Sequence, residues 1–105
     1  MSTSKDLFAV ESPKYVRVDE GVHWSLDTTN YGGSPTSVSV AVYDADDADT
    51  DVTSATMPGT PTVSSDTIQL PEFQSADKGN FRVMITFSNA RFTPARVELD
   101  VVVVR

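Results

Sequence analysis

A period-two alternation of apolar and polar residues is the strongest pattern in this chain. It is clearest in residues 81–88, where every second residue is Phe, Val or Ile, and it recurs in residues 22–28, 37–43 and 95–104. Successive side chains of a strand point to opposite faces, so each of these segments predicts a strand with one buried face. No segment shows a 3.6-residue apolar stripe of helical length.

Shorter apolar segments add further strand candidates, at residues 7–10, 15–18, 51–57 and 66–70. The chain has 29 β-branched residues (15 Val, 2 Ile, 12 Thr) against four Leu, a composition typical of pleated, half-buried surfaces. Gly, Pro, Asn and Asp cluster between the candidates and mark turns. We therefore expect an all-β fold, a two-sheet antiparallel β-sandwich of about seven or eight strands, with a closed barrel as the alternative.

At 105 residues the chain has the size of one domain. We expect a polar N-terminal tail over residues 1–6 and a single domain over residues 7–105. The start of the chain lacks the charged and apolar regions of a secretory signal. Its longest apolar run, residues 101–104, is far short of the ~20 residues that span a bilayer, so we expect no membrane partner.

Composition limits the chemistry that this chain supports. The net charge of −7 disfavours a nucleic-acid partner, because phosphate backbones would be repelled. The chain has no Cys and one His, which excludes disulfides, thiol nucleophiles and His-pair metal sites. It has no Gly-x-Ser-x-Gly elbow, so we expect neither an enzyme nor a bound cofactor.

Trp24 and His23 alternate within one strand candidate. Trp24 shares a face with Val22 and Leu26, which predicts a core position between the sheets. His23 then points outward as an ordinary residue on the sheet surface.

Charge is unevenly distributed along the sequence. Residues 18–77 hold 11 acidic residues and no basic one, while the two flanks together are positive. Two interpretations stay open: solvated acidic loops, or a domain with an acidic and a more basic end that suits head-to-tail contacts between copies.

Five aspartates within eight residues are candidate metal ligands. Carboxylate oxygens are the ligands that calcium prefers, and the aspartates are Asp44, Asp46, Asp47, Asp49 and Asp51. The spacing departs from an EF-hand loop, which needs Gly where Val52 stands and Glu where Pro58 stands. The alternative is a solvated hairpin tip whose like charges discourage aggregation.

Four residues are candidates for contact with a partner. Tyr31 and Phe92 are aromatic residues in turns, and the alternative for each is packing over the end of its own sandwich. Val102 and Val104 lie on the polar face of the last strand candidate. This makes the end of that strand apolar on both faces, so it is either covered by the N-terminal segment or open to a partner.

Residues 75–83 resemble the start of strand F in immunoglobulin-like domains, which carries an Asp-x-Gly-x-Tyr-x-Cys motif. Asp77 and Gly79 match, while Phe81 stands at the Tyr position and Val83 at the Cys position. The resemblance implies an immunoglobulin-like sandwich with residues 66–70, 81–88 and 95–104 as strands E, F and G. It implies neither the hydroxyl hydrogen bond of a tyrosine corner nor an inter-sheet disulfide.

A second resemblance extends over most of residues 34–87. The segments are Pro35 to Asp44, Asp51-Val52-Thr53-Ser54, Met57-Pro58-Gly59, Asp66-Thr67-Ile68 and Gly79-x-Phe81-Arg82-Val83. They are similar to small immunoglobulin-like virion proteins of tailed bacteriophages.

The second resemblance implies a virion structural protein, made in the host cytoplasm, that docks on capsid, portal, neck or tail subunits. Within this group we expect a head-to-tail adaptor or neck component, in a homo-oligomeric ring. The alternatives are a capsid decoration protein or a calcium- or carbohydrate-binding β-sandwich module.

Overall fold

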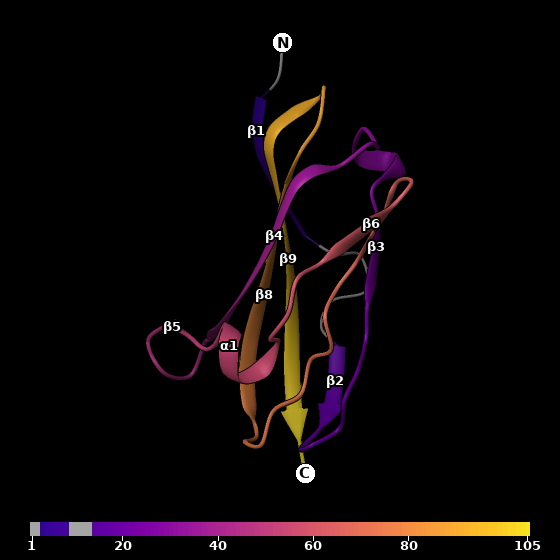
Figure 1. The fold of residues 1–105 in the computed structure, drawn as a ribbon. Helices are drawn as coiled ribbons and strands as arrows, with labels where there is room; N and C mark the ends of the chain where they lie inside the picture. The colour runs from indigo at the N-terminus through magenta and orange to yellow at the C-terminus, as the bar shows by residue number, and fades with distance from the viewer. Residues whose placement is uncertain (1–2, 9–13) are drawn as a thin grey trace.

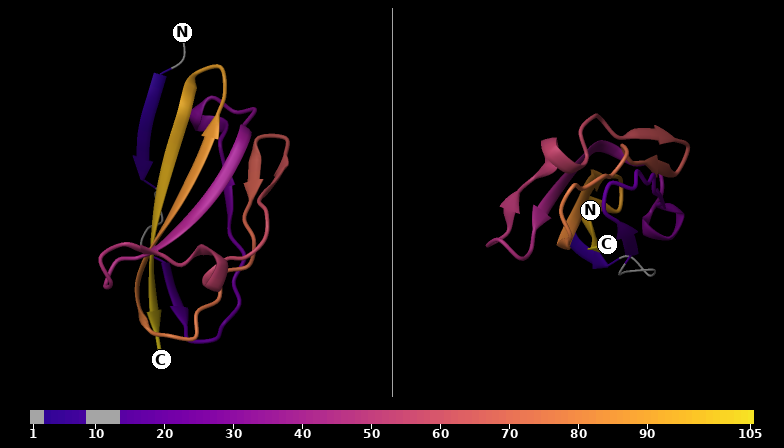
Figure 2. Two further views of the ribbon diagram at one scale, coloured as in Figure 1. Left: turned by 60° about the vertical axis from the view of Figure 1, so that its left-hand side comes forward. Right: turned by 90° about the horizontal axis from the view of Figure 1, so that it is seen from below.

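Nine strands form two sheets in the computed structural model, which describes residues 3–8 and 14–105. The first sheet has the order β1-β9-β8-β4-β5, with β2 also paired to β9, and the second has the order β3-β7-β6. Figures 1 and 2 show the two layers face to face. The strands are β1 (Thr3–Phe8), β2 (Lys14–Arg17), β3 (Ser25–Asp27), β4 (Thr36–Asp44), β5 (Thr50–Asp51), β6 (Thr62–Ser64), β7 (Thr67–Gln69), β8 (Gly79–Ser88) and β9 (Phe92–Val104).

This topology confirms the all-β sandwich and rules out the barrel alternative, because the strands belong to two separate hydrogen-bonded sheets. β4, β8 and β9 share one sheet, while β3, β7 and β6 form the other. Strands C, F, G and B, E, D are divided in this way in immunoglobulin domains. The segments expected as strands E, F and G are indeed β7, β8 and β9.

The sheet is not purely antiparallel as expected, because β1 and β2 both run parallel to β9. The expected polar tail over residues 1–6 is also corrected, since residues 3–6 belong to β1 and pair with β9. The strand candidate at residues 7–10 overlaps β1 only at its start, and residues 9–10 lie outside the described part of the chain.

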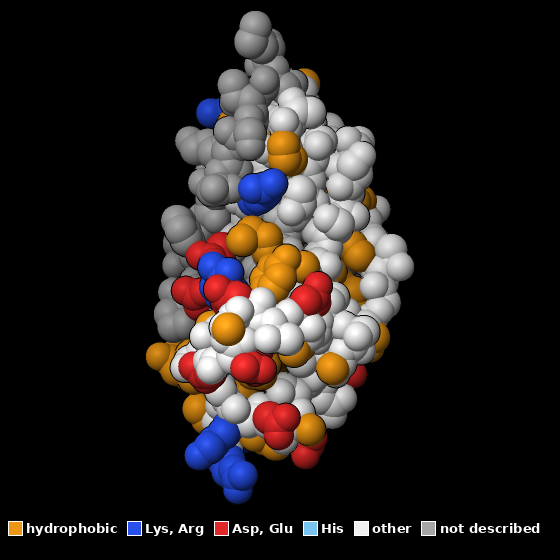
Figure 3. Space-filling view, turned by 90° about the vertical axis from the view of Figure 1, so that its left-hand side faces the viewer, with side chains coloured by type: hydrophobic (Ala, Val, Ile, Leu, Met, Phe, Trp, Pro, Cys, Tyr) orange, Lys and Arg blue, Asp and Glu red, His pale blue; other side chains and the backbone are white. Residues whose placement is uncertain are grey.

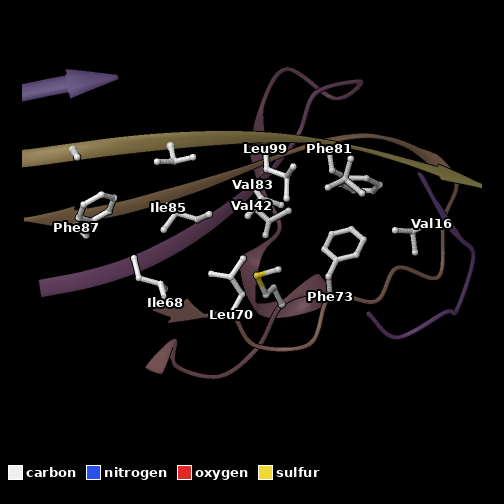
Figure 4. Packing of buried hydrophobic residues seen from close by; sticks show 14 of the residues in the cluster. Val16, Val42, Ile68, Leu70, Phe73, Phe81, Val83, Ile85, Phe87 and Leu99 are labelled. Atoms are coloured by element: carbon white, nitrogen blue, oxygen red, sulfur yellow. The ribbon is translucent and has the colours of Figure 1, made fainter. Parts of the chain in front are cut away.

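Alternation along β8 and β9 builds the core, as the sequence predicts. Phe81, Val83, Ile85 and Phe87 of β8 are all buried, and so are the four alternate residues 97, 99, 101 and 103 of β9. Ile68 of β7 packs against them together with Leu70 and Phe73 from the segment that follows β7 (Figure 4). Each such side chain stabilises the fold by roughly 1.5–3 kcal/mol through burial alone.

Aromatic rings fill one end of this core. The ring centroid of Phe73 lies 5.5 Å from that of Trp24 and 5.9 Å from that of Phe81. Trp24 packs against this core but is only half-buried, so the predicted core position between the sheets holds in part. Phe81 therefore packs its ring into the core, at the position where the strand-F motif of immunoglobulin-like domains has a tyrosine.

One strand candidate is wrong. Residues 51–57 form the short helix α1 (Thr53–Thr56) after only two residues of strand β5. Asp51 Oδ1 accepts hydrogen bonds from both the N–H (2.9 Å) and the hydroxyl (2.6 Å) of Thr53, which starts a helical turn instead of extending a strand. A 3-10 helix, η1 (Thr29–Tyr31), precedes β4.

Candidate functional site

The aspartate-rich loop between β4 and β5 is held in place by hydrogen bonds and an ion pair of its aspartates. Asp44 Oδ1 accepts from the N–H of Asp46 at 3.0 Å, and Asp47 accepts from the hydroxyl of Thr50 through its backbone oxygen at 2.6 Å. Asp49 forms an ion pair with Arg82 at 3.4 Å, and Arg82 also bonds Glu98 at 3.1 Å. The loop is thus an ordered hairpin tip and not a loose acidic segment.

Asp46 links this loop to the start of β8. Its Oδ2 accepts from the backbone N–H of Asn80 at 2.8 Å, and its Oδ1 accepts from the Asn80 side-chain amide at 3.1 Å. These donors favour the charged carboxylate, so they lower the pKa of Asp46 below its ordinary value of 3.8. Gly79 permits the close approach, because a Cβ there would lie 3.0 Å from Asp46 Oδ2.

The five aspartates do not converge on a common point, since each carboxylate has a separate local partner. Among the described residues, no group of three or more His, Cys, Asp or Glu side chains is arranged to hold a metal ion. The geometry therefore favours the hairpin-tip interpretation of Asp44, Asp46, Asp47, Asp49 and Asp51. The hydrogen bonds from backbone and hydroxyl donors supply the contacts that a cation would have to replace.

Tyr31 and Phe92 pack over the end of the sandwich, the alternative considered for both. Phe92 is only 6% exposed, with the Arg91 guanidinium 5.1 Å from its ring centroid. Tyr31 is half-buried against the core within η1. The side-chain amide of Asn89 donates to the carbonyl oxygens of Tyr31 (3.0 Å) and Gly33 (2.9 Å), which ties η1 to the β8–β9 turn.

Val102 and Val104 lie on the outer face of the larger sheet. β2 pairs with the edge of β9 there and places Tyr15 beside Val102 and Arg17 beside Val104. β2 does not cover the outer face, because Tyr15 is 71% exposed and Val104 41% exposed. We call Tyr15, Val102 and Val104 the terminal apolar patch, in which Tyr15 and Val104 are exposed and Val102 is half-buried.

Sequence reasoning missed Tyr15 as a member of this patch. Its neighbour Val16 is buried, so the alternation of β2 already places Tyr15 on the outer face. The sequence does not reveal that β2 pairs with β9, because parallel pairing of two strands far apart in the chain leaves no local sequence pattern.

His23 points outward as predicted. Its side chain is 69% exposed, with Nε2 3.8 Å from Glu72 Oε2 and Nδ1 3.5 Å from the carbonyl oxygen of Leu70. The described contacts of His23 include no serine hydroxyl.

Two segments on one flank of the sandwich contribute no charged side chain, although Asp66 bonds to Ser34 at one end and Arg82 lies over Tyr43 at the other. No residue in segments 34–43 and 52–65 is acidic or basic, and together these segments supply the N-terminal part of β4, helix α1 and strand β6. β4 and β6 lie at corresponding edges of the two sheets, so the segments share one side of the molecule. We call this surface the uncharged flank, and the upper right of Figure 3 shows part of it in white and orange.

The fold places this chain among all-β sandwiches in which β4, β8 and β9 share one sheet and β3, β7 and β6 form the other. No protein-family model and no curated protein matches the chain. Among the described residues, no helix is long and apolar enough to cross a membrane.

Proposed function

We propose that this chain is a bacteriophage virion structural protein, a head-to-tail adaptor or neck component that docks on neighbouring virion subunits. The observation that carries the proposal is its resemblance to small immunoglobulin-like virion proteins. The residues of that resemblance fall on β4 and β8 of the larger sheet, on β7 of the smaller sheet and on α1. They therefore describe the framework of the sandwich and are not confined to one loop.

Docking requires a rigid body and exposed contact surfaces. Rigidity comes from the continuous core between the sheets, and exposed apolar contact area comes from the terminal apolar patch. Large exposed apolar side chains such as Tyr15 are effective anchors in protein interfaces. The proposed mechanism is therefore association with other virion proteins, without catalysis.

The test is to purify phage particles and identify their proteins by mass spectrometry, with abundant host proteins as the contamination control. We expect this chain in the particle at a fixed stoichiometry, and its absence would overturn the proposal. Deleting the gene should give filled heads and separate tails. Joined particles with fragile capsids would instead indicate a decoration protein and contradict the adaptor role.

A surface variant sharpens this test. Tyr15→Asp places a charge in the terminal apolar patch, and Ser25→Asp places one at an exposed position on β3 as the matched control. We expect Tyr15→Asp to lower incorporation into particles at least several-fold while Ser25→Asp is incorporated normally. Equal incorporation of the two variants would exclude the patch as the docking surface.

A further inference from the structure

The open edge of β4 lies within the uncharged flank. β5 pairs only with Tyr43 and Asp44, and the neighbouring Val42 bonds to the segment that begins α1: its N–H donates to Thr53 Oγ1 and its C=O accepts from Val52, both at 2.8 Å. Among the described strands, none pairs with the rest of this edge.

The direction of the free backbone groups follows from alternation. Val42 directs its N–H and C=O away from β8, and alternate residues of a strand direct these groups the same way. Val40 and Val38 therefore present theirs at the open edge. At the other end the strand is irregular, because Ser37 has φ +52° and the register with β8 shifts between Thr36 and Ser39. The accessible run is residues 38–41.

Natural proteins usually protect such an edge with charges or proline, and residues 36–41 contain neither. On a chain of net charge −7, residues 38–41 also let two identical strands pair without like charges inside the paired segment. The local sequence Val38-Ser39-Val40 reads the same in both directions. An antiparallel copy would therefore set Val opposite Val and Ser opposite Ser, which is the self-complementarity that a two-fold interface needs.

We propose that β4 pairs antiparallel with β4 of a second copy, across a two-fold axis at Ser39. Val38 of one copy and Val40 of the other then exchange two backbone hydrogen bonds, and symmetry doubles the number. The antiparallel arrangement also keeps the two aspartate-rich loops at opposite ends of the paired strands. With the axis at Ser39 the two copies of Asp44 stand ten strand positions apart, about 33 Å, well beyond the ~8–10 Å range of screened charges.

The absence of cysteine makes the register directly testable. Residues at the axis form a non-hydrogen-bonded pair with a Cα separation of about 4.5 Å, within disulfide reach, so Ser39→Cys should oxidise to a covalent dimer. Ala41→Cys is the matched control on the same strand and face. In this register Ala41 lies opposite Ser37 of the other copy and about 13 Å from its own counterpart, so it should stay monomeric. No dimer with Ser39→Cys, or equal dimer with both variants, would overturn the register.

A second measurement avoids cysteine. Sedimentation equilibrium of the unmodified chain should show a concentration-dependent dimer. Ser39→Lys, which places two like charges at the axis on an exposed face, should weaken the dimer about fivefold or more without changing the thermal melt of the monomer. A single-chain mass at all concentrations would overturn the proposal. The inference does not depend on the virion proposal: a chain that dimerises but is absent from particles would overturn only the proposed function.

Discussion

Phe73 is the residue whose ring joins the aromatic end of the core. It is fully buried and contacts the rings of Trp24 and Phe81 on either side. Phe73→Ala should lower the free energy of unfolding by about 3–5 kcal/mol, because it removes apolar contacts and leaves a cavity. Denaturant unfolding measures this loss. Tyr15→Ala, at a 71% exposed aromatic, is the control and should change stability by no more than about 0.5 kcal/mol.

Asp46 makes the link between the aspartate-rich loop and β8 depend on pH. Hydrogen bonds from Asn80 lower the pKa of Asp46 in the folded state below its ordinary value of 3.8. A group with a lowered folded pKa contributes stability above its unfolded pKa and loses it as pH falls through the folded value. Asp46→Asn should therefore be less stable than the unmodified chain at pH 7, and the difference should shrink as pH falls below 3.8. A difference independent of pH would contradict this role, and NMR titration of Asp46 gives its pKa directly.

At the scale of elements, α1 is attached to β4 by a relay of hydrogen bonds. The N–H of Val42 donates to the Thr53 hydroxyl, which donates to Asp51 Oδ1. Thr53→Val keeps the shape but leaves a half-buried N–H unpaired, so it should cost about 1–3 kcal/mol of unfolding free energy. Thr53→Ser retains the hydroxyl and should recover most of the loss. Equal stability of Thr53→Val and the unmodified chain would show that these hydrogen bonds do not contribute to the free energy of unfolding.

The sequence predicted those elements whose alternation is long enough to mark a buried face. β4, β8 and β9 meet this condition, and their inward residues were identified correctly. The sequence does not predict β6, because all three of its residues are exposed and no alternation of buried and exposed residues is present. The sequence predicts a strand at α1, because Val52 and the threonines have high β propensity. The hydrogen bond from the Thr53 N–H to Asp51 Oδ1 favours the helical turn instead.

The candidate sites were harder to predict than the strands, for a physical reason. Spacing brought five aspartates together in sequence, but it carried no information on Asn80, Arg82 or Thr53, which direct Asp46, Asp49 and Asp51 to different places. Likewise, burial of Phe92 depends on η1 and the β8–β9 turn, which lie far apart in the chain.

At the scale of the whole molecule, the acidic turns lie toward the same end. The turn at residues 19–20 bonds to Ser75 and follows Val18, which bonds to Val104 at the end of β9. Asp46 bonds to Asn80 at the start of β8, and Asn80 pairs with Val102 near the end of β9. Arg17, which pairs with Val104, and Arg105, which follows it, lie at this end too, so acidic and basic residues are mixed there and the arrangement does not select the acidic-end interpretation.

The single core predicts one cooperative unfolding transition for the domain. Trp24 is the only tryptophan and packs on Phe73, while the larger sheet contains most of the strand residues. Trp24 fluorescence and far-ultraviolet circular dichroism should therefore give the same denaturation midpoint. Separate midpoints would mean that the β3-β7-β6 layer comes apart from the larger sheet before the larger sheet unfolds.

The Thr53 relay at Val42 also limits how long an added strand can be. A strand that extends along β4 meets α1 at one end and the left-handed Ser37 at the other, so only about four residues are available for pairing. An edge of this length can pair with one short strand, and the two-fold contact uses all of its free backbone groups. Growth into a continuous sheet would need a second open edge in the same copy, so β4 pairing alone stops at two chains.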